Sequence, residues 1–138
     1  MSGPDVFGES PYFSKTDVVG QVVAVLRGVT DQRGLQIEGY RSRAVRAGDV
    51  HELMITDEPA DIGKTVNHVA LIAFFEVTQG GVLLQHDRVT IDGADIGRLA
   101  GFNETHMPNH QNICLVGIVQ DGAALGVTLC SEVRVSRP

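Results

Sequence analysis

The fold is decided by residues 65–77, which read Thr65-Val66-Asn67-His68-Val69-Ala70-Leu71-Ile72-Ala73-Phe74-Phe75-Glu76-Val77. β-Branched and aromatic residues dominate this stretch, as they do in β-strands. Strict alternation would place one set of apolar side chains on one face: Val69, Leu71, Ala73, Phe75 and Val77. The other face would carry Ala70, Ile72 and Phe74. A strand that is apolar on both faces is covered on both sides. Because the chain shows few helical signals, we expect the second cover to be another copy of the chain, in a homo-oligomer such as a dimer.

Further strand-like runs flank this stretch and are joined by short turns. We expect strands over residues 17–29, 35–45, 50–56, 82–91, 94–102, 113–120 and 124–135, the last with Leu129 facing the core. Asp92-Gly93 and Asp121-Gly122 have the composition of two-residue hairpin turns, and residues 57–63 look like a capped helical turn. The chain is therefore predicted to be all-β, a small antiparallel β-barrel of about six to eight strands with a short helical turn.

Length and composition indicate one domain, with an N-terminal arm over residues 1–14 and a single β-barrel domain over residues 15–138. A formal net charge of −6 argues against a nucleic-acid partner, and no apolar run is long enough to predict a membrane span. Cys114 and Cys130 lie in strand-like runs without a secretory signal pattern before them. We expect both to be reduced core thiols of a cytoplasmic protein.

The second half of the chain carries a set of turn residues that resembles a known family. The set includes residues 87–93, Asp-Arg-Val-Thr-Ile-Asp-Gly, residues 96–101, Ile-Gly-Arg-Leu-Ala-Gly, and then Asn103-Glu104 and His110. Over about residues 54–136 the sequence resembles the glucitol (sorbitol)-specific IIA proteins of the bacterial sugar phosphotransferase system. The resemblance implies a small antiparallel β-barrel. It also implies a phosphoryl-accepting histidine after an acidic Pro-containing turn, and His68 stands at that position.

The densest group of polar residues is the segment from Glu104 to Asn112, between two predicted strands. His106 or His110 would act as general base or acid, since imidazole takes up and releases protons near neutral pH. Glu104 would orient the imidazole, while Asn109 and Asn112 would donate hydrogen bonds to the ligand. Pro108 argues against a regular helix in this segment. In the alternative interpretation, the same polar groups satisfy the backbone of an irregular connection.

Other polar residues are candidate ligand-binding groups, namely Asn67, His68, His86 and Asp87. Asn67 shares its predicted strand face with core residues and would point into the barrel. Arginines 41, 43 and 46 form either a solvated strand edge or a contact for a carboxylate or phosphate.

Together these features predict a small-molecule-binding β-barrel that is a cofactor-independent acid–base enzyme of the isomerase, cyclase or lyase type. Its partners would be a small-molecule substrate and a second copy of the chain, without nucleic acid or membrane. The first alternative is a non-catalytic binding or regulatory barrel of the phosphotransferase-system kind. The second is a metal protein with Glu104, His106 and His110 as ligands, two imidazoles and a carboxylate.

Overall fold

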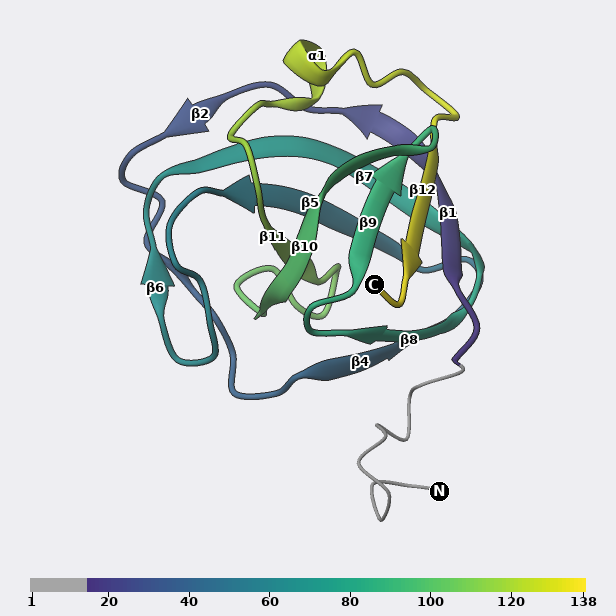
Figure 1. Ribbon diagram of the computed structural model, residues 1–138, viewed down its shortest axis with the longest axis horizontal. Helices are drawn as coiled ribbons and strands as arrows, with labels where there is room; N and C mark the ends of the chain where they lie inside the picture. Colours follow the sequence, from purple (N-terminus) through teal and green to yellow (C-terminus); the bar gives the residue numbers. More distant parts are fainter. Residues whose placement is uncertain (1–14) are drawn as a thin grey trace.

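The structure is a computed structural model that describes residues 15–138, so the predicted arm over residues 1–14 lies outside the described residues. The described chain contains twelve strand segments and one short helix, joined by turns and loops. The strands are β1 (Val18–Val25), β2 (Val29–Thr30), β3 (Leu35–Gln36), β4 (Ser42–Val45), β5 (Val50–Thr56), β6 (Thr65–Val66), β7 (Val69–Gln79), β8 (Gly81–Leu84), β9 (Arg88–Ile91), β10 (Ala94–Asn103), β11 (Asn112–Val116) and β12 (Glu132–Ser136). The helix is α1 (Gly122–Leu125), at the top of Figure 1 beside β7.

Seven strands close into a ring in the order β1-β12-β9-β10-β11-β5-β7, and β7 pairs again with β1 (Figure 1). The prediction of an all-β fold built on one closed sheet of about six to eight strands is confirmed. Six of the seven pairings are antiparallel, whereas β5 and β11 run parallel. The purely antiparallel order expected from the sequence is therefore wrong at this one pair. Two small sheets, β3 with β6 and β4 with β8, lie outside the ring order.

The side chains of β7 are buried on both faces, as predicted, but the chain itself supplies both covers. A register shift between Leu53 and Met54 of β5 leaves Ile72 of β7 without a partner, as a β-bulge. The bulge changes the alternation, so that Ile72 and Ala73 both face the main core of the ring. Val69 faces a second apolar cluster, which residues of β3 and β6 complete. The homodimer thus stays a prediction, without the support that an uncovered face of β7 would give it.

Four predicted strands are broken in the structure. The run over residues 17–29 forms β1 and the first residue of β2, and the run over residues 65–77 forms β6 and most of β7. The run over residues 35–45 forms β3 and β4, which pair with different strands. The run over residues 82–91 forms β8 and β9, with His86 at a positive φ of 77° between them. A non-glycine residue in this conformation turns the chain sharply. These corners direct β3, β4 and β8 into the two small sheets outside the ring.

The C-terminal third differs most from the prediction. Asp121 does not begin a hairpin but caps α1, because its side chain accepts a hydrogen bond from the backbone N–H of Ala124 at 2.8 Å. The last strand is consequently confined to residues 132–136. Leu129 is 65% exposed, and Cys130 is also exposed, so neither is a core residue. Cys114 is buried as predicted, and both cysteines are free thiols.

The acidic turn over residues 57–63 is also not helical. It contains a tight turn in which the Lys64 backbone N–H donates to the Asp61 carbonyl at 3.0 Å, with Gly63 at a φ of 80°. The short helix expected here is therefore found at α1 instead.

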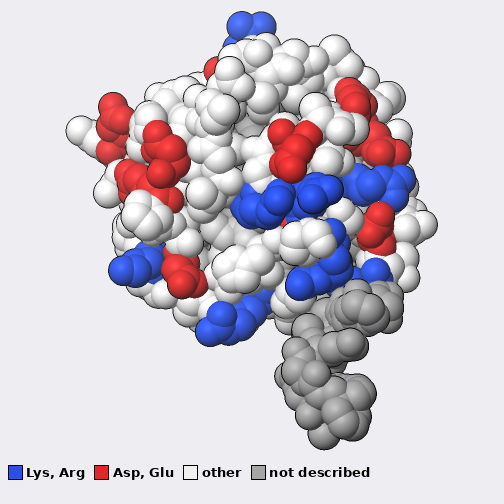
Figure 2. All heavy atoms as spheres, in the orientation of Figure 1, with Lys and Arg blue, Asp and Glu red and all other residues white. Residues whose placement is uncertain are grey.

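Basic and acidic side chains lie side by side on the face shown in Figure 2, over the region of β9 and β12. Arg88 and Arg98 both lie near Asp95, at 3.6 and 3.2 Å, and Arg134 lies 3.1 Å from Asp17. These three arginines are thus locally balanced by carboxylates.

Among residues 15–138, no helix has both the length and the apolar composition to cross a membrane.

Candidate functional site

The segment from Glu104 to Gln111 links β10 to β11 through successive tight turns. The Met107 N–H donates to the Glu104 carbonyl and the Asn109 N–H to the His106 carbonyl, both at 3.0 Å. No regular helix forms, in agreement with the effect expected of Pro108. The turns nevertheless bring the rings of His106 and His110 together, with centroids 5.1 Å apart. The two histidines are therefore neighbours without the geometry of a helix.

Two backbone contacts fasten the end of this segment to β5. The Glu52 N–H donates to the Gln111 carbonyl, and the Gln111 N–H donates to Nδ1 of His51, both at 3.0 Å. These contacts continue the parallel register in which Asn112 lies opposite Glu52. Because β5 and β11 run parallel, both strands begin at the same end of the ring. The residues that precede the two strands therefore lie close together there.

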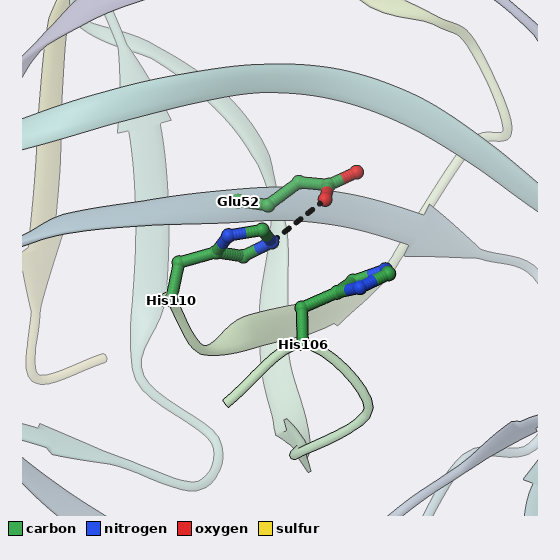
Figure 3. Close-up of side chains that lie close together, drawn as sticks. All are labelled: Glu52, His106 and His110. Atoms are coloured by element: carbon green, nitrogen blue, oxygen red, sulfur yellow. Dashed lines mark ion pairs between the residues drawn. The ribbon is translucent and has the colours of Figure 1, made fainter. Parts of the chain in front are cut away.

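Glu52 and His110 are the central pair of the site (Figure 3). Nε2 of His110 lies 3.3 Å from Oε1 of Glu52, and Phe74 packs edge-on against the His110 ring with centroids 4.9 Å apart. The Glu52 side chain is only 8% exposed. Within residues 15–138, no hydrogen bond reaches its carboxylate. One ligand atom each from Glu52, His106 and His110 lies within 4.8 Å of the other two.

A pocket of about 640 Å³ lies beside this pair, between the β10–β11 segment and the start of β5. Its lining comes from two parts of the chain: Arg43, Ala44, Arg46, Gly48, Asp49, Val50 and His51 on one side, and Met107, Pro108, Asn109 and His110 on the other. His110 therefore borders the pocket. The lining of this pocket does not include Glu52, which stands behind His110. The pocket has the size typical of small-molecule sites.

The charged groups of the pocket favour a negative ligand. Arg46 lies 4.0 Å from Asp49 and shares that carboxylate's charge. For Arg43, no ion pair occurs within the described part of the chain. One guanidinium at the pocket wall is thus without a local counterion, and guanidinium groups bind carboxylates and phosphates through paired hydrogen bonds.

His51 presents a neutral imidazole to the pocket. Burial lowers the pKa of His51, and the nearby carboxylate of Asp49 opposes this effect only in part. Its Nδ1 accepts the N–H of Gln111, so the proton of the neutral ring lies on Nε2. Nε2 has no hydrogen-bond partner in the described structure. Nε2 is itself buried and lies 3.8 Å from Oδ2 of Asp49, so His51 forms part of the pocket wall and not a free donor.

Glu104 does not orient either histidine, which corrects the prediction. Its Oε2 instead accepts the hydroxyl of Tyr40 at 2.7 Å. Burial, followed by this hydrogen bond, raises the pKa of Tyr40 to about 12. The Gln111 amide donates to the same hydroxyl at 2.9 Å. The carboxylate next to the histidines is that of Glu52. Glu104 instead links the start of the segment to Tyr40.

The two asparagines predicted to bind ligand lie in different parts of the structure. Asn109 lines the pocket, in the position the sequence suggested. Asn112 is fully buried, and its amide donates to the side chain of Asn103 at 3.0 Å, so it braces β11 against β10. Asn67 is exposed rather than inside the ring, because its side-chain oxygen accepts the Gly34 N–H at 3.0 Å.

The remaining predicted site residues lie outside the pocket lining. His68 lies at the surface, with Nδ1 3.0 Å from Asp57 and Nε2 3.6 Å from Asp31. The hydrogen bond with Asp57 raises the pKa of His68. His86 is exposed at the corner between β8 and β9. Asp87 next to it is fully buried, in contact with Lys15 and Arg137.

The sequence interpretation missed Glu52 and His51. Their local signal is a polar pair, His51-Glu52, directly before the apolar run Leu53-Met54-Ile55 in one strand. A polar pair buried at the start of an apolar strand needs partners, and those partners come from the β10–β11 segment. Only the tertiary pairing of β5 with β11 reveals them.

Comparison with known proteins identifies a family to which the chain belongs. Residues 12–136 match a family described as "Family of unknown function (DUF6917)", which covers most of the chain. No curated protein and no solved structure gives a significant match. The chain is therefore a member of the family of unknown function DUF6917.

Proposed function

We propose that this protein binds a small organic molecule with a negatively charged group in the pocket beside His110 and moves a proton on it. The reaction would be of the isomerase, cyclase or lyase type. One observation carries the proposal: His110 borders the pocket while the buried carboxylate of Glu52 lies 3.3 Å from its Nε2. A carboxylate at Nε2 of an imidazole fixes the ring and its tautomer, which leaves Nδ1 for proton transfer.

Two further groups support a ligand with developing negative charge. Arg43 would hold an anionic group of the ligand, as an arginine without a local counterion. Asn109, in the lining of the pocket, would donate a hydrogen bond from its side-chain amide. Donors placed in advance around a developing oxyanion stabilise it more effectively than water, because they need not reorganise.

Hydrogen–deuterium exchange tests the proposal without knowledge of the natural substrate. A panel of small keto acids, hydroxy acids and phosphorylated carbonyl compounds is incubated with the full chain in heavy water and followed by NMR. We expect the protein to catalyse exchange at a carbon next to a carbonyl in at least one compound. His110→Ala should abolish this exchange, and Glu52→Gln should reduce it by roughly 10²-fold or more, in line with the contribution of a positioned acid–base group.

Glu104→Gln is the matched control, since it makes the same chemical change at a carboxylate that contacts Tyr40 instead of the histidines. It should leave exchange unchanged. Equal exchange in the wild type and in His110→Ala, with both proteins folded, would contradict the proposal.

The phosphoryl-acceptor role of His68 stays a prediction. The observation that favours it is an imidazole at the surface, where a partner protein can reach it. Asp31 and Asp57 on either side would repel an incoming phosphoryl group, so we rank this role second. Incubation with a phosphoryl-donor system, followed by intact-mass measurement of wild type and His68→Ala, tests it.

A further inference from the structure

We propose that Glu52, His106 and His110 together bind a divalent transition-metal ion. This inference goes beyond the proposed function, which needs only Glu52 and His110, and it would deepen that function by placing an ion next to the same pocket. The three residues come from two places, β5 and the β10–β11 segment, and Figure 3 shows the carboxylate above two neighbouring imidazoles.

The distances between the ligand atoms are close to those of a metal centre. Ligand atoms about 2.0–2.1 Å from a tetrahedral zinc ion lie roughly 3.4 Å from one another. Nε2 of His110 and Oε1 of Glu52 are already 3.3 Å apart. All three ligand atoms lie within 4.8 Å of one another, so no pair has to approach by more than roughly 1.4 Å. His106 is exposed on a tight turn, where rotation of its side chain can supply this movement.

A second observation is that the ligand atoms of the two inner residues have no hydrogen-bond partner among residues 15–138 and are in polar contact only with each other, at 3.3 Å. The Glu52 side chain is more than nine-tenths buried, and within residues 15–138 no hydrogen bond reaches its carboxylate. Nε2 of His110 is buried and also has no hydrogen-bond partner. Buried charges are normally paired, hydrogen-bonded or bound to a metal. A single cation between these atoms would satisfy both groups.

The surrounding structure holds the inner ligands in place. The backbone contacts of Gln111 to His51 and Glu52 fix the end of the segment that carries His110. Phe74 packs against the His110 ring and restricts its rotation. Metal sites depend on such support, because ligands that are already oriented lose little entropy when the ion binds.

The ligand set defines the kind of ion. Two imidazoles and one carboxylate suit zinc, cobalt, nickel or ferrous iron, whereas magnesium and calcium prefer sets made of oxygen atoms. Three protein ligands leave at least one coordination position for water or a bound molecule. His110 would thus join the ion to the wall of the pocket.

The test is metal binding by the full chain, without any substrate. The protein is stripped with a chelator and titrated with Zn²⁺ by calorimetry, and with Co²⁺ by absorption spectroscopy. We expect one ion per chain and a cobalt spectrum without a thiolate charge-transfer band, which excludes Cys130 as a ligand. Glu52→Gln, His106→Ala and His110→Ala should each weaken binding by more than the roughly 10–100-fold that loss of an outer-sphere partner costs.

Two matched controls separate this site from adventitious surface binding. Glu104→Gln repeats the carboxylate change outside the set, and His68→Ala removes a histidine that lies between Asp31 and Asp57. Both should bind the ion like the wild type. The proposal is overturned if the wild type takes up no ion, or if a control variant weakens binding as much as His106→Ala.

His106 also distinguishes this inference from the proposed function. If Glu52 and His110 act without metal, His106→Ala leaves proton exchange intact. If the ion takes part, the same variant loses metal affinity and exchange together. Metal binding without any exchange activity would leave the metal site standing and reject the proposed function alone.

Discussion

Oδ1 of Asp87 lies 3.1 Å from Nη1 of Arg137, and this contact ties the end of the chain to the corner between β8 and β9. The other carboxylate oxygen lies 3.0 Å from Nζ of Lys15, and the Leu84 N–H donates to it at the same distance. Asp87 is fully buried. It therefore neutralises cations from both ends of the described chain.

Asp87→Ala should destabilise the fold strongly, because it leaves Lys15 buried without its counterion. Removal of one member of a buried ion pair costs about 3–5 kcal/mol. We expect a loss near the lower end of this range, since Arg137 is partly exposed. Urea unfolding followed by circular dichroism measures the change. Asp17→Ala, which breaks an exposed pair with Arg134, should cost less than about 1 kcal/mol. Equal losses in the two variants would contradict this assignment.

Gly122→Ala should destabilise the contact of α1 with β7. A Cβ atom at this position would come within 2.0 Å of the backbone oxygen of Ile72, which cannot move without disturbing the ring. Overpacking of this kind costs about 1–3 kcal/mol. Gly39→Ala is the control, because a Cβ atom there meets nothing within 4 Å. Thermal unfolding should separate the two variants, and equal melting temperatures would argue against the close packing of α1.

Stability should fall in acid partly through Asp121. Hydrogen bonds from the backbone N–H groups of Gly28 and Ala124 lower the pKa of Asp121 in the folded state. A lowered folded pKa means that the stabilisation is present above the unfolded value of about 3.9 and is lost as the pH falls through the folded value. Asp121→Asn keeps an acceptor for the cap but does not titrate. Its melting temperature should therefore decline less than that of the wild type between about pH 5 and pH 2. Parallel curves would show that Asp121 contributes nothing to the acid transition.

The two cysteines should react very differently with thiol reagents. Burial raises the pKa of Cys114 to about 12 and shields it, while Cys130 is exposed. In the native state we expect one thiol to react with a chromogenic disulfide, and two in denaturant. Cys130→Ser should show no fast reaction before unfolding. Fast modification of Cys114 in the folded variant would contradict its placement in the core.

The sequence predicts those parts of the fold that depend on local patterns. The Asp92-Gly93 turn forms as expected, with both residues at positive φ, because this turn type demands that conformation. The burial of β7 on both faces follows from its composition alone. The bulge at Ile72 does not, since one unpaired residue changes the alternation without changing the composition.

The candidate site could be predicted only in part, for a similar reason. His106, Asn109 and His110 stand close together in the sequence, and their polar density marks the segment. Glu52 is a long way off along the chain, and only the pairing of β5 with β11 brings it to His110. The sequence offered Glu104 as the carboxylate because it is near in the chain. The structure directs Glu104 to Tyr40 instead.

The parallel pair of β5 and β11 follows from the number of strands in the ring. Strand directions can alternate around a closed ring only if the number of strands is even, and this ring has seven. At least one neighbouring pair must therefore run in the same direction. Two such strands begin at the same end, so the segments that lead into them arrive side by side. The odd number of strands thus places the residues that lead to Glu52 beside those that lead to Asn112. The candidate site lies at the one pair of neighbouring ring strands that do not run in opposite directions.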